Sequence, residues 1–124
     1  MYRILVCDDD KDIVEAIDIY LTQEGYEVLK AYDGDEAIKV LKRNEVDLLI
    51  MDVMMPVMDG LEATKAIREL EREDAKKIPI IAMTANAFEE DRKACLEAGM
   101  NEHIGKPIDI PLLKRTITKA IGDR

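Results

Sequence analysis

Five short apolar runs recur along the chain, separated by stretches with helical periodicity. They are rich in Ile, Val and Leu, as is typical of strands that are buried on both faces. The runs are Ile4–Cys7, Tyr26–Ala31, Asp47–Met51, Ile78–Met83 and His103–Gly105. Between them, apolar residues three or four positions apart form helical stripes: Ile13, Ile17 and Leu21; Ala37, Val40 and Leu41; and Leu113, Ile117 and Ile121. This alternation predicts a doubly wound α/β fold, a parallel sheet covered by helices on both faces.

Polar residues and glycines mark where the predicted helices begin and end. Asp33 with Glu36, and Asn86 with Glu89, have the spacing of a helix N-cap and a reciprocal acid. Glycine accepts the left-handed conformation that often ends a helix, and helix ends are expected at Gly25, Gly99 and Gly122. The highly charged stretch Glu69–Lys77 is expected to be the solvated end of the third helix and a loop.

Composition narrows the functional classes. A chain of 124 residues suits one domain, expected over residues 1–124. With 18 basic and 27 acidic residues, the net charge of −9 opposes binding to nucleic acid or anionic membranes. No apolar run approaches the ~20 residues that span a bilayer, and Asp8 follows the first run too early for a secretory signal, so we expect a cytoplasmic protein. Two cysteines and one histidine provide neither a disulfide framework nor a zinc site.

Polar side chains follow four of the five predicted strands. Asp8, Asp9 and Asp10 follow the first, Asp52 the third, Thr84 the fourth and Lys106 the fifth. The carboxyl ends of parallel strands meet at one edge of the sheet, where ligands bind.

Carboxylates crowded at such an edge repel each other unless a cation lies among them. Hard oxygen ligands favour Mg²⁺ or Ca²⁺, and a site that also holds a phosphoryl group favours Mg²⁺. Taken singly, each residue has an ordinary structural interpretation. Asp8, Asp9 and Asp10 suit a helix N-cap and its first turn, and Lys106 suits a solvated surface lysine. Their shared position at the sheet edge favours a site.

Four motifs give the chain a resemblance to the receiver domain of bacterial two-component response regulators. They are Val6-Cys7-Asp8-Asp9-Asp10, the run from Asp52 to Gly60 (DVMMPVMDG), Met83-Thr84-Ala85 and Gly105-Lys106-Pro107. The resemblance extends over essentially the whole chain. It implies a flavodoxin-like (βα)5 sandwich with strand order 2-1-3-4-5, the order of the chemotaxis response regulator.

The resemblance also implies residue roles at the sheet edge. Asp52 matches the phosphoacceptor, a carboxylate nucleophile that needs no general base because it is ionised near pH 7. Asp9 and Asp52 match direct Mg²⁺ ligands, Asp8 supports them, and the backbone carbonyl of Met54 completes the protein ligands.

Further roles follow from the same resemblance. Lys106 and the Thr84 hydroxyl would contact phosphoryl oxygens, and Pro56 and Gly60 would shape the loop after the nucleophile. His103 lies where most relatives have a Tyr or Phe switch residue. It is expected to couple Thr84 to the face formed by the fourth helix, fifth strand and fifth helix. The Lys106–Pro107 peptide bond is expected to be cis, against a base rate of about 5–6%.

The function implied is that of a phosphorylatable receiver, which is a switch and not an enzyme acting on other substrates. Its expected partners are a histidine kinase or histidine phosphotransfer protein and an unknown downstream protein, and we expect a monomer or a weak phosphorylation-dependent dimer. The alternative is a Mg²⁺-dependent phosphatase with an aspartate nucleophile. Such enzymes usually have a second acid two residues after the nucleophile, where this chain has Met54. A glycine-rich nucleotide-binding loop is absent after the first predicted strand.

Overall fold

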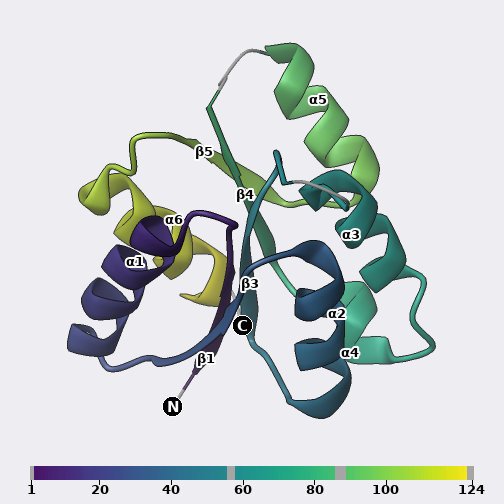
Figure 1. The fold of residues 1–124 in the computed structure, drawn as a ribbon, viewed down its shortest axis with the longest axis horizontal. Coiled ribbons are helices and arrows are strands. Elements are labelled where there is room, and N and C mark those ends of the chain that lie inside the picture. Colours follow the sequence, from purple (N-terminus) through teal and green to yellow (C-terminus); the bar gives the residue numbers. More distant parts are fainter. Residues whose placement is uncertain (1, 56–57, 86–88, 123–124) are drawn as a thin grey trace.

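Five parallel strands form one sheet between two layers of helices in the computed structural model, which describes residues 2–55, 58–85 and 89–122 (Figure 1). The strands are β1 (Arg3–Cys7), β2 (Glu27–Ala31), β3 (Leu48–Asp52), β4 (Ile80–Thr84) and β5 (Glu102–Gly105). The helices are α1 (Lys11–Gln23), α2 (Gly34–Arg43), α3 (Gly60–Arg68), α4 (Glu73–Lys77), α5 (Glu89–Ala98) and α6 (Ile110–Gly122). In this part of the chain, every helix is too short or too polar to cross a bilayer.

The strand order is β2-β1-β3-β4-β5, which confirms the predicted order. Every residue of β3 and β4 is buried, as expected for the inner strands of a sheet covered on both faces. The register places Asp52 opposite Met83, and Thr84 opposite Gly105. The ends of β1, β3, β4 and β5 therefore lie along one edge of the sheet.

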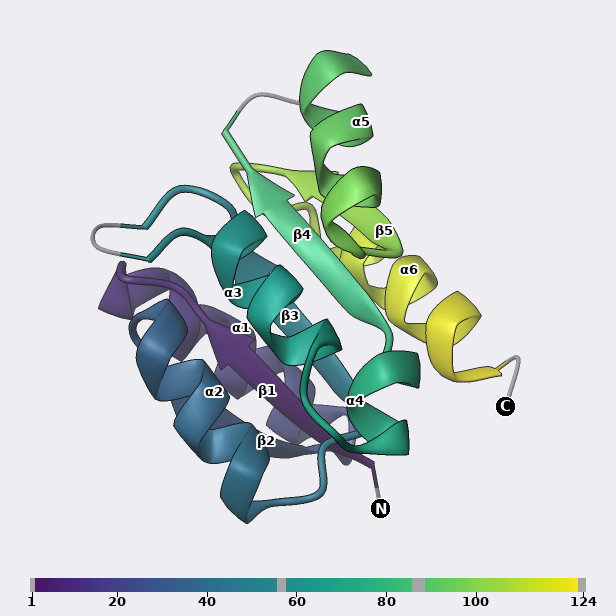
Figure 2. The same ribbon diagram turned by 90° about the vertical axis from the view of Figure 1, so that its right-hand side faces the viewer.

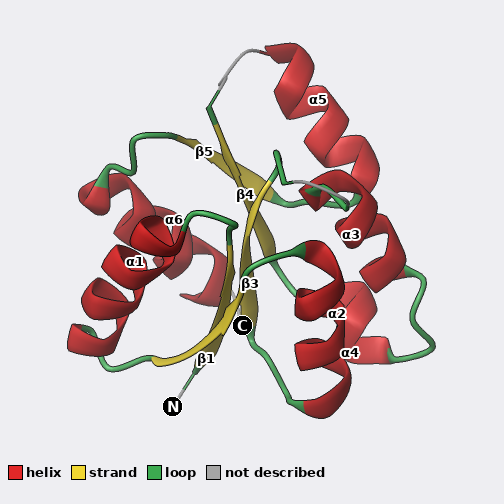
Figure 3. Ribbon diagram, in the orientation of Figure 1, coloured by secondary structure: helices red, strands yellow, loops and turns green. Residues whose placement is uncertain are grey.

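Alternate side chains of each strand enter two separate cores. Ile4, Val6 and Ile50 pack with α1 and α6 on one face. Leu5, Leu49 and Met51 pack on the opposite face, which α2, α3, α4 and α5 cover (Figure 3). The predicted helical stripes lie in these cores. Those on α1 and α6 include Ile17, Leu21, Leu113, Ile117 and Ile121, and Ala37 and Leu41 are buried on α2.

The stretch Glu69–Lys77 was expected to end the third helix and continue as a loop, and this expectation is wrong for residues 73–77. Helix α3 ends at Arg68, and residues Glu73–Lys77 form the separate short helix α4 beside the amino ends of the strands (Figure 2). Ala75 is buried within this helix, and Leu70, in the segment before it, packs against the core, so the charged stretch is fixed to the domain at both places.

Most of the predicted helix boundaries agree with the structure. Asp33 caps α2, its Oδ1 accepting a hydrogen bond of 2.7 Å from the backbone N–H of Glu36. Gly25 and Gly99 end α1 and α5 with φ values of 90° and 111°. Gly122 is the last described residue of α6. The N-cap predicted at Asn86 lies outside the described residues.

Candidate functional site

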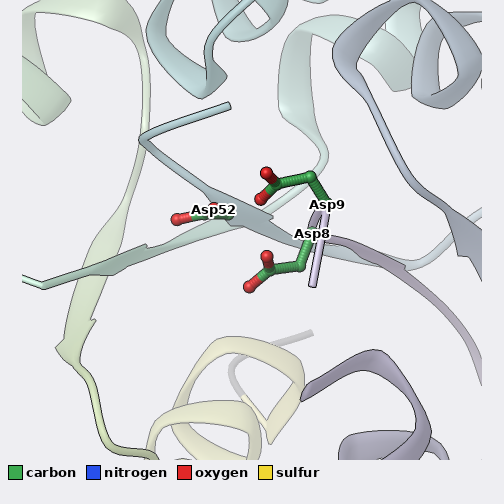
Figure 4. Close-up of side chains that lie close together, drawn as sticks. All are labelled: Asp8, Asp9 and Asp52. Atoms are coloured by element: carbon green, nitrogen blue, oxygen red, sulfur yellow. The ribbon is translucent and has the colours of Figure 1, made fainter. Parts of the chain in front are cut away.

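Three carboxylates meet at the carboxyl edge of the sheet. Asp8 and Asp9 follow β1, and Asp52 ends the neighbouring strand β3 (Figure 4). One carboxylate oxygen from each residue lies within 4.8 Å of the corresponding oxygens of the other two. Asp8 is fully buried, Asp52 is 2% exposed, and Asp9 is open to solvent. The sheet therefore brings together the three acids that were predicted to form a metal site.

Asp10, the third acid of the same run, has a structural role instead. Its Oδ1 accepts hydrogen bonds from the backbone N–H groups of Asp12, at 2.9 Å, and Ile13, at 3.4 Å. These contacts make Asp10 the N-cap of α1. The capping interpretation of the acidic run is therefore right for Asp10, while Asp8 and Asp9 belong to the carboxylate cluster.

Lys106 extends from the end of β5 into the carboxylate cluster. Its Nζ lies 2.9 Å from Oδ2 of Asp8 and 3.2 Å from Oδ1 of Asp52. The Lys106 backbone N–H donates to the Thr84 carbonyl oxygen at 2.9 Å, which fixes the start of the loop after β5. The Lys106–Pro107 peptide bond is cis, as predicted.

Burial and neighbouring charge perturb both members of the Lys106–Asp52 pair. Burial, with the negative charge of Asp8, raises the pKa of Asp52 to about 6, although Lys106 opposes this shift. Burial alone would lower the pKa of Lys106, but its contacts with Asp8 and Asp52 outweigh burial and raise it. At pH 7 Asp52 is therefore mainly ionised, as expected, and Lys106 is fully charged.

The backbone after β3 fits closely around Asp52. The Met54 N–H donates to Oδ1 of Asp52 at 3.3 Å, and the Gly60 N–H donates to the Val53 carbonyl at 2.9 Å. A Cβ on Gly60 would collide with the Asp52 carbonyl oxygen, so this position needs glycine. Pro56 lies outside the described residues, and the ligand role of the Met54 carbonyl stays a prediction.

Thr84 and His103 lie on neighbouring strands next to the cluster. Thr84 is buried at the end of β4 opposite Gly105, and His103 is half-buried opposite Ala82. Residues two apart on a strand share a face, so Thr84 and His103 are diagonal neighbours on the face covered by α5. His103 also lines a small cavity of about 20 Å³ with residues of α5, including Cys95 and Leu96. Their switch roles stay predictions.

One contact at this edge was not expected from the sequence. The Nζ of Lys11, the first residue of α1, lies 5.7 Å from the centre of the Tyr32 ring. Tyr32 directly follows β2, the one strand that no predicted site residue follows. The signal in the sequence was a lysine directly after the acidic run. Only the parallel pairing of β1 with β2 brings the tyrosine beside it.

The charges in the site suit a divalent cation. Three carboxylates and one close ammonium leave an excess of negative charge, and the pKa of Asp52 is raised first by burial and then by the repulsion from Asp8. All of the side-chain donors are carboxylate oxygens, the ligands that Mg²⁺ prefers. The three acids therefore fit a hard divalent cation, and the adjoining lysine fits an anion bound beside it.

Comparisons with known proteins agree with this arrangement. The family model for the response regulator receiver domain matches residues 4–118. The receiver domain of sensor histidine kinase PA1611 from Pseudomonas aeruginosa PAO1, solved with a magnesium ion coordinated in the active site cleft, is 38% identical. The alignment covers 98% of each chain with a TM-score of 0.88. Chemotaxis protein CheY4 of Vibrio cholerae is 32% identical, with a TM-score of 0.91 over 97% of this chain and 98% of that chain.

Much longer kinases also contain a matching segment. Sensor histidine kinase RcsC of Escherichia coli K12 is 38% identical over 115 residues, which is 93% of this chain and 12% of that kinase. The chain spans only 7% to 16% of the length of this and two other matching kinases. The fold, the carboxylate cluster and the family match over residues 4–118 lead to one conclusion: the chain belongs to the response regulator receiver domain family.

Proposed function

We propose that residues 1–124 form one receiver domain that accepts a phosphoryl group on Asp52. The observation that carries this proposal is a nearly buried carboxylate, with a pKa of about 6, held between Asp8 and the ammonium of Lys106. In the transfer, a carboxylate oxygen of Asp52 attacks phosphorus and the bond from phosphorus to the donor breaks. The leaving group takes the bonding electron pair, and an aspartyl phosphate, a mixed anhydride, is formed.

Asp8, Asp9 and Asp52, with the Met54 carbonyl, would hold Mg²⁺. When bound, the cation offsets the charge between the acids and the phosphoryl oxygens. The magnesium-bound receiver of PA1611 supports this assignment, since it is 38% identical over nearly all of this chain. The carboxylate oxygens of the three acids are already gathered within 4.8 Å of one another, so little rearrangement is needed.

Lys106 and Thr84 would bind the oxygens of the transferred group. The Lys106 ammonium already lies beside the Asp52 carboxylate, so it can contact a phosphoryl group attached there as well as Asp8. Thr84 is buried at the end of the adjacent strand β4. The Asp52–Met54 contact fixes the nucleophile and leaves its second oxygen, Oδ2, for the attack.

The proposed phosphodonor is a histidine kinase or a histidine phosphotransfer protein. The domain would catalyse its own phosphorylation and slow dephosphorylation, and would have no other substrate. Because a histidine kinase takes its phosphoryl group from ATP, this role places the domain in the cytoplasm. The phosphatase alternative is disfavoured by the exposed Met54, which occupies the position where such an enzyme needs a second acid.

The output would be a change in the surface formed by α5, β5 and α6. The helix expected as the fourth corresponds to α5, because α4 is an additional helix. Movement of Thr84 toward a phosphoryl group would open space for the diagonally placed His103. A downstream protein of unknown identity would bind the altered surface, and the domain would act as a monomer or as a weak dimer formed on phosphorylation.

The test is intact-mass analysis after incubation with acetyl phosphate and Mg²⁺. We expect one added phosphoryl group on the wild-type chain and none on Asp52→Asn, which removes the nucleophile with almost no change in volume. Asp35→Asn is the matched control, because Asp35 pairs with Lys39 on the exposed face of α2 and its replacement should not affect uptake. Equal uptake by Asp52→Asn and wild type, or full uptake in the presence of a chelator, would contradict the proposal.

A further inference from the structure

The carboxyl edge of the sheet carries a second lysine beside the acids. Lys11 begins α1, is exposed, and places its Nζ 5.7 Å from the centre of the Tyr32 ring. That distance is within the ~6 Å over which a cation is attracted to an aromatic face. The half-buried ring therefore gives a flexible side chain one preferred position.

The backbone before Tyr32 is hydrogen-bonded to the backbone of the carboxylate cluster. Asp8 donates its backbone N–H to the Ala31 carbonyl at 3.2 Å, so the residue before Tyr32 is bonded to an acid of the site. Lys11 is three residues beyond Asp8 at the start of α1. Because β2 and β5 are the outer strands, Tyr32 with Lys11 lies toward one end of the sheet edge that carries the acids, and Lys106 follows the strand at the other end.

The two lysines differ in what they bind. Lys106 is held by Asp8 and Asp52, whereas Lys11 forms no ion pair with a carboxylate anywhere in residues 2–55, 58–85 and 89–122. Lys11 lacks such a partner although the chain has a net charge of −9 and aspartates occupy positions 8, 9, 10 and 12 on either side of Lys11. A positive charge that is held by a ring and not neutralised by an acid remains available to an anion that enters the site.

We infer that Lys11, positioned by Tyr32, captures the anionic phosphoryl group of the incoming donor and guides it to Asp52. The inference rests on the proposed function. An anion that approaches three carboxylates meets repulsion, and a cation on the approach path lowers this repulsion and increases the rate of productive encounter. Lys11 would act in the first step, when the donor is captured. In the second step Asp52 forms the bond to phosphorus, and the donor's leaving group departs with its electron pair.

This role predicts opposite effects on the two ligands of the site. Removing the Lys11 charge should slow capture of an anionic donor, because an attraction is lost. The same change should leave Mg²⁺ affinity unchanged or raise it, because a cation near the carboxylates repels the metal ion. A local distortion of the site would weaken both. The sign of the metal effect therefore separates donor capture from a structural role.

The experiment compares Lys11→Met, Lys11→Arg and Tyr32→Leu with wild type. Met keeps a long side chain without charge, Arg keeps the charge and its attraction to the ring, and Leu removes the ring. Lys76→Met is the matched control, since Lys76 is an exposed lysine on α4 at the opposite end of the sheet and its loss changes the net charge equally. Initial phosphorylation rates are measured against acetyl phosphate concentration at low ionic strength, and Mg²⁺ affinity from amide chemical shifts.

We expect Lys11→Met to lower the rate at subsaturating acetyl phosphate about three- to fivefold, as for the loss of one exposed charge contact. The maximal rate should be nearly unchanged, the difference should shrink at high salt, and Mg²⁺ should bind at least as well. Lys11→Arg should retain the wild-type rate, Tyr32→Leu should have an intermediate one, and Lys76→Met should match wild type.

A second measurement separates this inference from the proposed function. Methylphosphonate is an anion that cannot transfer its phosphorus group, and its titration in the presence of Mg²⁺ should shift the Lys11 side-chain resonances in wild type and in Asp52→Asn. Shifts at Lys11 on addition of methylphosphonate, combined with no phosphorylation of the wild type by acetyl phosphate, would support anion capture while contradicting Asp52 as acceptor. An unchanged rate in Lys11→Met, an equal loss in Lys76→Met, or weaker Mg²⁺ binding in Lys11→Met would overturn the inference.

Discussion

Lys106 forms an ion pair with Asp8 across two intervening strands. Its Nζ lies 2.9 Å from Oδ2 of Asp8, although Lys106 follows β5 and Asp8 follows β1, with β3 and β4 between them. The same ammonium is 3.2 Å from Oδ1 of Asp52. One cation thus partly neutralises two buried acids, and Asp52 still has a pKa of about 6. The burial of Asp52 and the repulsion from Asp8 that remains both have measurable consequences for stability.

Asp52→Asn should stabilise the domain at pH 7 in the absence of Mg²⁺. The folded pKa of Asp52, about 6, exceeds the ordinary value of 3.8, so folding favours the protonated acid. In the wild type, the contribution of Asp52 to the unfolding free energy is therefore fully present below about pH 4, and it is lost as the pH rises through 6. We expect a gain of about 1–3 kcal/mol in unfolding free energy for Asp52→Asn at pH 7.

Urea denaturation followed by circular dichroism at pH 4 and pH 7 measures this effect. The difference between Asp52→Asn and wild type should be small at pH 4 and larger at pH 7. Saturating Mg²⁺ should reduce it at pH 7, because a cation relieves the same repulsion in the wild type. A constant difference across this pH range would contradict the assigned pKa shift.

Asp9→Asn should weaken Mg²⁺ binding with little effect on folding. Asp9 is the exposed member of the carboxylate cluster, so its replacement removes one ligand charge without leaving a buried group unpaired. We expect a loss of about tenfold or more in Mg²⁺ affinity, measured by chemical-shift titration. Asp12→Asn, an exposed acid in the first turn of α1, is the control and should bind Mg²⁺ almost as wild type does. Equal affinities for both variants would argue against Asp9 as a ligand.

Arg68 should contribute strongly to stability. Its Nε and Nη2 donate to the Gly99 carbonyl at 3.0 and 2.7 Å, and Nη1 donates to the Ala75 carbonyl at 3.1 Å. Nη2 also lies 3.0 Å from Oδ1 of Asn101. The guanidinium therefore joins α3, α4 and the turn between α5 and β5, and Lys cannot reproduce this fork of donors.

We expect Arg68→Lys to cost about 1–3 kcal/mol in unfolding free energy, because it leaves partly buried carbonyl groups without donors. Lys65→Ala on the exposed side of α3 is the control and should change stability by less than about 0.5 kcal/mol. Urea denaturation at pH 7 measures both variants. A loss for Arg68→Lys as small as that of the control would show that water replaces these contacts.

The sequence predicted the strands and the acid site because both depend on local patterns. Runs such as Leu48–Ile50 are apolar throughout, so all of their side chains have to be buried, on whichever face of the sheet they lie. Once the strand order is known, residues that follow the strands must share an edge, and this brought Asp8, Asp52 and Lys106 together.

The features that were missed depend on contacts between distant segments. Helix α4 lies in a stretch whose composition suggests a loop, and it is fixed by one buried alanine, Ala75, and by Arg68, seven residues earlier. The Lys11–Tyr32 contact joins residues 21 positions apart through the pairing of β1 with β2. Neither contact leaves a periodic signal, because each involves single side chains whose partners are chosen by tertiary packing.

Phosphorylation at Asp52 should be transmitted to α5, β5 and α6 through Thr84 and His103. These residues are diagonal neighbours on β4 and β5, and His103 lines a cavity of about 20 Å³ with residues of α5. Movement of the Thr84 side chain toward Asp52 would leave room for the His103 ring to move inward. We expect beryllofluoride with Mg²⁺ to shift amide resonances on this face in the wild type.

Substitutions at both positions test this route. Thr84→Ala should reduce the shifts on α5 and β5 even at saturating beryllofluoride. It removes the group that moves and one contact to the bound mimic, while the carboxylates and Lys106 stay in place to hold the mimic. His103→Tyr should enlarge the shifts, since a larger ring that moves between inward and outward positions displaces more of the surface. Val46→Ala, at the amino end of β3, is the control for a small loss of core packing. Wild-type responses in both Thr84→Ala and His103→Tyr would show that the phosphoryl signal reaches α5 by another route.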